Sequence, residues 1–564
     1  YDFETNPYFE SRLINFYSNE INRLQYTTNG NELRYLQFGQ KYGRIDLATG
    51  KNYMGNASKS YFPNGRLMSL TGDSLYLISV DDSLVLLSSN TFNYTNRLYT
   101  DGYEKIDAFE TTPNEDVFFI SGQAGSIIGW DRKTNSRIFN TKIYTDSTTN
   151  SMYLYYDKHK NRLLTKATGN YILVIDATKG NIIDTIKVDK ARYCVATAKN
   201  IYVTTADGYL RVFDATNFKS TWSWAINGGK YEALSITLLP DEQYAIIQNT
   251  IRSLALFDII NEKFVYNIND HEYGSKTLAL SKDGKEFATG SLNGKINVYE
   301  TLTGKLKATI HLPYKKDAFI VDTLNHYLAT KNSLEAINVY YNDYVYPYDQ
   351  FDLQLNRPDL VLAKLGRADS SLINNYYNAY KKRLKKLNLS EKSVNLSLHL
   401  PRVKLLNRYN IKSSTSAKDY TLDIECSDDK FNLQSVQVLV NNSPVLSVNG
   451  KNISSLKTNK YNLQVTLPLA KGLNKVKVFC TNINGTTSLK ETFNVLSTFV
   501  DTLVTAKIYF VGIGVANYKD SSMNLTYSVK DIRDLASDFA TNFSRKTLVV
   551  DTLLNQNVTL ENIA

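Results

Sequence analysis

Residues Ala506–Phe543 read AKIYFVGIGVANYKDSSMNLTYSVKDIRDLASDFATNF and change pattern twice. The run Ile508–Val515 is apolar, too short for a membrane helix, and typical of a strand buried on both faces of a parallel sheet. A polar turn, Asn517–Asn524, follows, and then an amphipathic helix with apolar residues at Val529, Ile532, Leu535, Phe539 and Phe543. A second short strand is expected at Thr547–Leu553. Strand, helix and strand in this order predict the opening of an α/β fold, whose remaining elements we expect beyond the last residue.

The length and composition of the chain indicate a multidomain protein without a membrane span. At 564 residues it has room for three or four domains, and 43% hydrophobic with 21% charged residues is an ordinary balance. No apolar stretch approaches the ~18 residues that a spanning helix needs, so we expect no transmembrane segment. The first residue is Tyr1, with no leader pattern after it. Either a leader has been removed or the numbering begins inside a longer chain.

The net charge of +10 would suit an acidic partner. Much of the excess lies between Lys381 and Lys412 and not in a stripe along a whole domain. Basic runs of this kind are more often solvated helix faces, so we expect no nucleic-acid partner.

The cysteines and histidines show no metal-binding or cofactor-binding pattern. Three cysteines (Cys194, Cys426 and Cys480) are too few for a disulfide scaffold or a Cys-rich zinc site. The histidines occur singly and are interpreted as turn or core residues: His159, His271, His311, His326 and His399. We predict no metal, no cofactor and no catalytic residue, and we interpret Cys194 as a small core side chain.

The first 345 residues contain a repeat with a period near 42 residues. A strand that ends in an apolar or aromatic residue followed by Asp, or by a substitute for it, recurs eight times. The eight marks are Ile45–Asp46, Leu87–Ser88, Trp130–Asp131, Ile175–Asp176, Phe213–Asp214, Phe257–Asp258, Tyr299–Glu300 and Tyr340–Tyr341. The carboxylates at these marks are expected to bond the turn that follows and not to act as catalytic acids.

Each repeat unit reads as four short antiparallel strands joined by tight Asp-Gly or Asn-Gly turns, which is one propeller blade. The units resemble WD-type blades, although the Trp-Asp pair survives only at Trp130–Asp131. Eight marks predict eight blades, and seven is the alternative if the first or last unit is incomplete. The segment Ser11–Ser18 is a candidate for the missing strand of the last unit. A propeller is a rigid platform, so we expect a protein partner on one of its faces.

A connector, residues 346–417, follows the repeats. The tetrapeptide Asn356–Asp359 contains a proline and interrupts the strand pattern. A helix is predicted from about Ser370, with an apolar side (Leu372, Ile373, Tyr376, Tyr380, Leu384 and Leu387) and a basic side (Lys381, Lys382, Arg383, Lys385 and Lys386). We interpret the basic side as a match to the negative end of the helix dipole; a membrane-surface or nucleic-acid patch is the alternative.

Residues 418–498 alternate between apolar and polar side chains over five or more short strands, as in an immunoglobulin-like β-sandwich. Cys426 and Cys480 share the inward parity of two different strands. Their placement resembles the inter-sheet disulfide of such domains. A bond would imply an oxidising compartment, and two buried free thiols are the alternative.

With these parts in order, the chain resembles bacterial caspase-like cysteine peptidases that carry an N-terminal WD-type propeller. Three segments carry the resemblance: FVGIGVANYKD with LTYSVKDIRDLA, NRPDLVLAKLG with YYNAYKKRLKKL, and GLNKVKVFCTNINGT. Asn517, Tyr518 and Asp531 match positions of the family's opening motif. Asp531 is expected to fix the first helix against the loops of the sheet, and a direct contribution to the substrate groove is the alternative. On this resemblance, residues 505–564 are the first part of a caspase-like α/β domain.

The resemblance implies a catalytic His within a Gly-His-Gly-like motif and a Cys nucleophile further along. No His or Cys occurs after Cys480, so both are expected downstream of residue 564 and none can be assigned here. The first hypothesis is therefore the protein-binding portion of a caspase-like endopeptidase. The second is a non-catalytic adaptor or scaffold in a bacterial cell-envelope assembly, in a complex that could be membrane-associated. A location outside the cytoplasm (periplasm, cell surface or secreted) is favoured, and the cytoplasm is the alternative.

Overall fold

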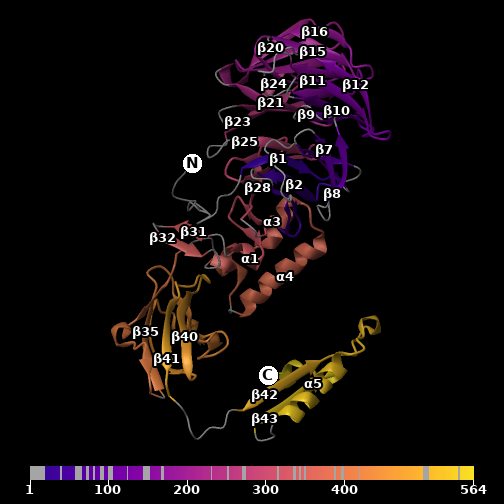
Figure 1. Cartoon of the computed structure of the whole chain (residues 1–564). Helices are drawn as coiled ribbons and strands as arrows, with labels where there is room; N and C mark the ends of the chain where they lie inside the picture. Colours follow the sequence, from indigo (N-terminus) through magenta and orange to yellow (C-terminus); the bar gives the residue numbers. More distant parts are fainter. Residues whose placement is uncertain are drawn as a thin grey trace.

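The computed structural model describes most of the chain between residues 20 and 563, and the candidate segment Ser11–Ser18 lies outside its described residues. These are 20–37, 41–56, 67–70, 75–80, 83–88, 94–99, 106–122, 125–143, 153–166, 170–229, 232–249, 253–269, 275–313, 317–334, 338–341, 344–347, 351–386, 389–394, 399–417, 419–499, 507–543 and 547–563. The protein is mainly β, with helices in a connector and in a C-terminal α/β unit (Figure 1). No helix in this described part is both long enough and apolar enough to cross a membrane.

Seven antiparallel sheets follow one another between Ile21 and Ala329, and each begins with four consecutive strands. The first four sheets are β1 (Ile21–Tyr26), β2 (Glu32–Gln37), β3 (Lys41–Asp46) and β4 (Asn52–Asn56); β5 (Leu67–Leu70), β6 (Leu75–Val80), β7 (Ser83–Ser88) and β8 (Tyr94–Tyr99); β9 (Ile106–Thr111), β10 (Val117–Gly122), β11 (Ser126–Asp131) and β12 (Ser136–Lys142); and β13 (Leu154–Asp157), β14 (Arg162–Lys166), β15 (Tyr171–Asp176) and β16 (Ile182–Lys187).

The last three sheets of the series continue the same order. They are β17 (Ala191–Ala196), β18 (Asn200–Thr205), β19 (Tyr209–Asp214) and β20 (Ser220–Ala225); β21 (Ala233–Leu238), β22 (Tyr244–Asn249), β23 (Ser253–Asp258) and β24 (Lys263–Asn269); and β25 (Ser275–Leu280), β26 (Glu286–Ser291), β27 (Lys295–Glu300) and β28 (Leu306–His311), which β29 (Phe319–Asp322) and β30 (Tyr327–Ala329) extend to six strands.

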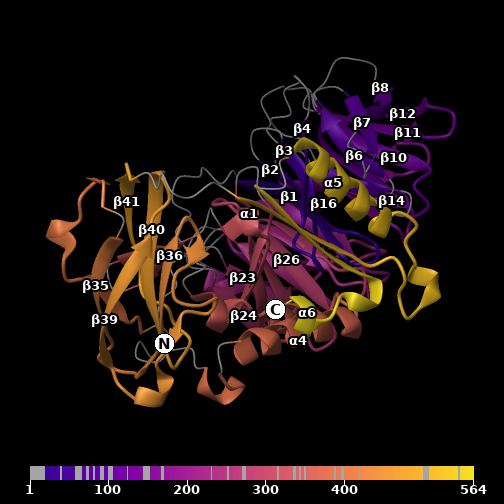
Figure 2. The same cartoon turned by 90° about the horizontal axis from the view of Figure 1, so that it is seen from below.

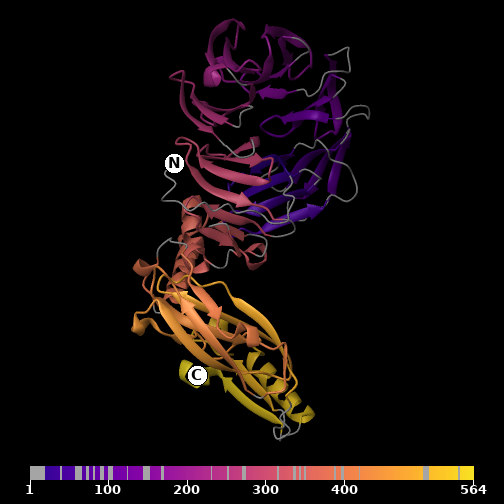
Figure 3. The same ribbon diagram turned by 90° about the vertical axis from the view of Figure 1, so that its left-hand side faces the viewer.

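The first strands of several neighbouring sheets lie side by side. Strand β13 contacts β9 and β17, and β17 contacts β21. Strand β1 contacts β5 of the next sheet and also β25 of the seventh. The first and last sheets of the series therefore pack against each other, and Figure 3 shows them together above the connector. A shared core joins them, in which Ile21 and Leu33 of the first sheet meet Ile296 and Ile310 of the seventh.

The prediction of eight four-stranded units is wrong for the last unit within the described residues. The eighth mark lies in β31 (Asn338–Tyr341), which pairs only with β32 (Tyr344–Pro347) in a two-stranded sheet. The strands before this mark, β29 and β30, belong to the seventh sheet, because Phe319 of β29 pairs with His311 of β28. Seven sheets of at least four strands agree with the alternative count.

His311 is a buried imidazole in β28, and it predicts an acid-sensitive step in stability. Its side chain is 2% exposed, its ring lies edge-on to Phe319, and its Nδ1 makes no hydrogen bond. Burial lowers the pKa of His311 from 6.5 to about 3, with a smaller effect of the charge on Lys295. The folded state therefore keeps the ring neutral at pH values where the unfolded chain protonates it.

We expect this contribution to be fully present above pH 6.5 and to be lost as the pH falls towards 3, because the unfolded state binds the extra proton. The free energy of unfolding should fall by about 1.4 kcal/mol per pH unit within this window from this group alone. Denaturant titrations between pH 4 and pH 7 on the wild type and on H311L would measure it. Parallel pH curves for the two proteins would contradict the prediction.

The connector consists of α2 (Asp352–Leu355), α3 (Pro358–Leu365) and α4 (Ser370–Lys386), preceded by α1 (Lys331–Leu334). Helix α3 begins with Pro358, whose missing N–H is unneeded at that position, and ends at Gly366 in the left-handed conformation. Its buried side chains Val361, Leu362 and Leu365 enter the core shared by the first and seventh sheets. Helix α3 thus covers the seam where the series of sheets meets itself.

After the connector, two sheets enclose a second core (Figure 2). One sheet holds β33 (Arg402–Leu405), β35 (Asp419–Ser427) and β39 (Lys460–Pro468). The other holds β34 (Ser414–Thr415), β41 (Glu491–Ser497), β40 (Gly472–Asn482), β36 (Leu433–Val440), β37 (Ser443–Pro444) and β38 (Lys451–Asn452). The predicted inward parity is correct, since Leu422, Ile424, Val476 and Val478 are all buried in that core.

The C-terminal unit contains β42 (Ile508–Gly514), α5 (Ser528–Asn542), β43 (Leu548–Leu554) and α6 (Leu560–Ile563), and β42 and β43 pair in parallel. The expectation that β42 is buried on both faces is wrong. Helix α5 covers one face, where Ile532 lies against Gly512, but Tyr509 and Val511 on the other face are 68% and 64% exposed. An apolar run shows only that both faces of a strand can be buried. In the described residues α5 covers one face of β42, and the other face is exposed.

Short 3-10 turns complete the described elements, at Ile226–Gly229, Glu391–Ser393, Arg408–Asn410, Ser454–Leu456, Ser521–Met523 and Asn555–Asn557.

Candidate functional site

The carboxylates at the repeat marks bond the turns that follow them, as predicted. Asp176 Oδ1 accepts the backbone N–H groups of Thr178 and Lys179 at 2.8 and 2.9 Å. The same contacts recur at Asp46, Asp131, Asp214 and Asp258. The backbone N–H of Lys179 is the main reason why the pKa of Asp176 is lowered. These carboxylates are therefore occupied as acceptors and are not general acids.

Asn517 and Tyr518 lie at the carboxyl edge of the parallel pair β42–β43. The backbone N–H groups of Ala516 and Asn517 both donate to Asn555 Oδ1, at 2.8 and 3.2 Å. The N–H of Tyr518 donates to Asn524 Oδ1 at 2.8 Å, and its ring is 40% exposed. The side chains of Asn517 and Tyr518 thus stand on a loop held at the edge where parallel sheets place their ligands.

Asp531 does not lie on the loop that carries Asn517 and Tyr518. It lies in the first turn of α5, exposed and beside Lys530, and its backbone N–H donates to Tyr527 O at 2.8 Å. We find no hydrogen bond from its carboxylate to the loops of the sheet within the described residues. The expectation that Asp531 fixes the helix to the loops of the sheet therefore stays a prediction. In the described residues Asp531 is exposed, near the positive end of the helix.

Cys426 and Cys480 face each other across the two sheets that follow the connector. Both are free thiols with 0% exposure, so the disulfide that their placement suggested is not formed in this structure. A hydrogen bond between the two thiols, together with burial, raises the pKa of Cys426. Cys194 is also fully buried, as expected for a core residue, and burial raises its pKa. None of the three thiols can reach a substrate.

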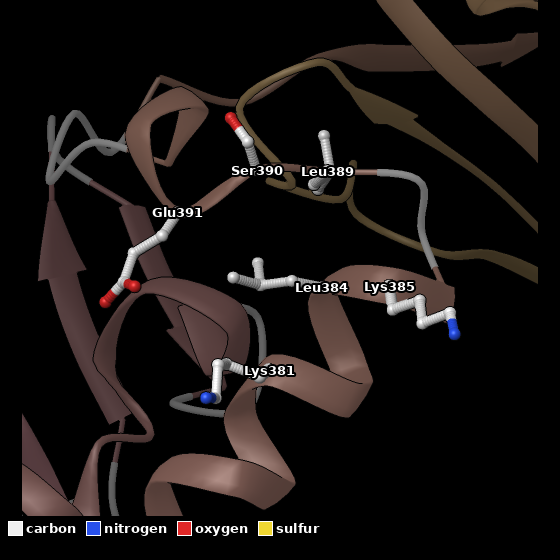
Figure 4. Close-up of a pocket in the computed structure, with 6 residues that line it drawn as sticks. All are labelled: Lys381, Leu384, Lys385, Leu389, Ser390 and Glu391. Atoms are coloured by element: carbon white, nitrogen blue, oxygen red, sulfur yellow. The ribbon is translucent and has the colours of Figure 1, made fainter.

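The connector carries an open pocket of about 510 Å³ at the C-terminal end of α4 (Figure 4). It is lined by Lys381, Leu384, Lys385, Leu389, Ser390 and Glu391. Leu384 is buried at the base, and the ammonium group of Lys381 lies 4.6 Å from the centre of the Tyr377 ring. The carboxylate of Glu391 accepts a hydrogen bond from Tyr377 Oη at 3.0 Å. An apolar base with two lysines at its rim can hold a carboxylate group.

One of the five basic residues of α4 is not on a solvated face. Arg383 donates to Asp352 Oδ2 and to the backbone oxygen of Asn356, both at 2.7 Å. It therefore ties α4 to the end of α2. The apolar side of α4 is as predicted where it is described, with Leu372, Ile373 and Tyr376 against the core of the sheets.

Sequence reasoning missed the pocket and a cluster of His399 with Asp428 and Asp429. Strands β33, β34 and β35 separate His399 from the two aspartates in the chain, so no spacing motif marks the cluster. His159 beside Glu242 is similarly paired only through the fold, whereas His326 and Asp322 are four residues apart in one turn. His271 lies outside the described residues.

Comparison with known proteins adds no relative. No family model matches the chain, and no curated protein matches it either.

Proposed function

We propose that this chain is the protein-binding, non-catalytic portion of a caspase-like cysteine endopeptidase. The observation that carries the binding role is the attachment of the connector. Helix α3 is buried between the first and seventh sheets, and Gln354 of α2 donates to Asn484 O at 3.2 Å in the loop after β40. The series of sheets, the connector and the two-sheet domain are thereby joined through buried contacts, as a rigid platform requires.

Three features support the identity of the parts. Seven four-stranded sheets with adjoining first strands and Asp-bonded turns suit a seven-bladed WD-type propeller. Two mainly antiparallel sheets around one core suit an immunoglobulin-like sandwich. A parallel pair with one crossover helix and an uncovered apolar face suits the opening of an α/β domain whose further layer lies outside these residues.

We expect no catalysis by these 564 residues because their thiols are buried. The family's nucleophile is a cysteine, and all three cysteines here are 0% exposed. We expect no hydrolysis when the chain is incubated with fluorogenic peptides that present acidic, basic and apolar residues at the cleavage position. Hydrolysis that is abolished by a thiol-alkylating reagent would refute the proposal.

The binding role is tested by placing a photo-crosslinking residue at Ile260 or at Val448 of the chain expressed in its own cells. Ile260 is 67% exposed on a turn of the sixth sheet, and Val448 is 80% exposed on the two-sheet domain. We expect a discrete protein adduct from positions such as Ile260 on the sheets and none from Val448. Equal labelling at both positions would argue against a propeller-borne site.

A scaffold in a cell-envelope assembly is the second candidate, and the same buried cysteines favour it. A longer chain that contains the family's His and Cys motifs would favour the peptidase. A chain in which either residue is replaced would favour the scaffold.

A further inference from the structure

The connector meets the two-sheet domain at a cluster of His399, Asp428 and Asp429. His399 lies just before β33, and the two aspartates follow β35 directly. His399 Nε2 is 2.9 Å from Asp428 Oδ1 and 2.7 Å from Asp429 Oδ1. One ligand atom from each residue lies within 4.8 Å of the other two. Two segments of the chain thus bring one imidazole and two carboxylates to a single point.

Asp428 is held in place as a carboxylate. Its side chain is 0% exposed, and its Oδ1 accepts the backbone N–H groups of Lys430 and Phe431 at 2.8 and 2.7 Å. Its Oδ2 accepts a hydrogen bond from Asn482 Nδ2 at 3.0 Å. Three donors to one buried carboxyl group fix its orientation.

His399 provides a second and independent observation. Its Nε2 atom is buried and makes no hydrogen bond, although two carboxylate oxygens lie within 3 Å of it. In a hydrogen-bonded pair the N–H points along the line to the acceptor. Three electron-rich atoms this close together repel one another unless a positive charge lies among them. The charge can be a proton on Nε2 whose N–H points at neither oxygen, or a metal ion.

We propose that His399, Asp428 and Asp429 bind one divalent transition-metal ion, for which Zn²⁺ is the best fit. Imidazole nitrogen and carboxylate oxygen are ordinary zinc ligands, and a water molecule completes the usual set of four. A neutral imidazole and two carboxylates balance the charge of the ion. Ca²⁺ fits less well, because it requires six to eight oxygen ligands.

The surroundings suit a metal site that is reached from one side. Asp429 is 69% exposed and offers the entry path, whereas the ring of Phe431 lies edge-on to His399 at 5.8 Å and limits its rotation. Asn482 Oδ1 also accepts the backbone N–H groups of Asn484 and Thr486. The ion would therefore fasten the segment before β33 to the same loop that contacts the connector, and its role would be structural.

The test is a zinc titration of the full 564-residue chain after dialysis against EDTA, with excess Mg²⁺ present and a chromophoric chelator as competitor. We expect one tightly bound zinc ion and a higher Tm with zinc than without it. H399A and D429N should each weaken this binding by at least ~100-fold, since both remove a direct ligand. D429N changes an exposed side chain, and its apo Tm shows whether the fold is kept.

H159A is the matched control. The side chains of His159 and His399 are 26% and 25% exposed, and both rings lie against carboxylates, but the ring of His159 pairs with a single carboxylate, that of Glu242. H159A should keep the zinc stoichiometry and affinity of the wild type. Absence of zinc binding, or zinc binding that survives in both H399A and D429N, would overturn the proposal.

Discussion

Replacement of Glu286 by alanine should lower the free energy of unfolding by about 3–5 kcal/mol, the usual cost of removing one partner from a buried ion pair. Glu286 lies in β26 of the seventh sheet and is 6% exposed. Its carboxylate accepts hydrogen bonds from Lys307 of β28 and from Arg367 in the turn between α3 and α4. Without it, the two partly buried cations Lys307 and Arg367 would lose the carboxylate that both of them contact.

The position of Arg367 explains why the loss should reach beyond one sheet. A Cβ atom added to Gly30, in the turn between β1 and β2, would lie 3.0 Å from the Arg367 guanidinium. Lys307 also donates to Leu365 O at 3.4 Å, at the end of α3. Glu286 therefore joins the seventh sheet, the first sheet and the connector at one point, and E286A should loosen the seam that α3 covers.

Glu300 is the control, because it pairs directly with Glu286 on the neighbouring strand but is exposed. Equilibrium unfolding in guanidinium chloride should place E300A within about 0.5 kcal/mol of the wild type, as for most surface substitutions. The triple variant E286M/K307M/R367M should be more stable than E286A, since it leaves no charge uncompensated. Similar unfolding free energies for E286A and E300A would contradict this account.

The difference between Glu286 and Glu300 also shows which contacts the sequence could not predict. Alternation and repeat spacing predicted the strands, the inward parity of Leu422 and Val476, and the turn-bonding carboxylates, because each depends on residues close in the chain. The partnership of Glu286 with Arg367 spans 81 residues and depends on where α3 packs. No local pattern contains that information.

The same limit explains the two errors about strands. A mark such as Tyr340–Tyr341 predicts a strand, and β31 is one, but the mark cannot show which sheet that strand will join. The apolar run of β42 predicts a strand that can be buried, whereas burial also requires a second layer. His399 and Asp428 are a third case, since their meeting depends on the packing of the connector against the sheets.

The second large effect is expected at Gly485, in the loop between β40 and β41. Its φ is +79°, and a Cβ atom there would lie 2.0 Å from Leu353 Cδ2 of the connector. G485A should cost about 1 kcal/mol for the left-handed backbone and about 1–3 kcal/mol more for the displacement of Leu353. Leu353 cannot move freely, because it packs with Tyr380 and Leu384 in a buried cluster.

Gly472 separates the two contributions. Its φ is +99° and no atom lies within 4 Å of its added Cβ, so G472A carries backbone strain without a collision. G485A should therefore be the less stable of the two, and only G485A should expose residues 389–394 of the connector to limited proteolysis. A double-mutant cycle with L353A should show a favourable coupling of at least about 1 kcal/mol, since the smaller side chain makes room for the new methyl group. Equal unfolding energies for G485A and G472A, or no coupling with Leu353, would mean that the loop can move away from the connector. The two-sheet domain would then be held mainly by other contacts, and the rigid attachment on which the platform role depends would have to come from elsewhere.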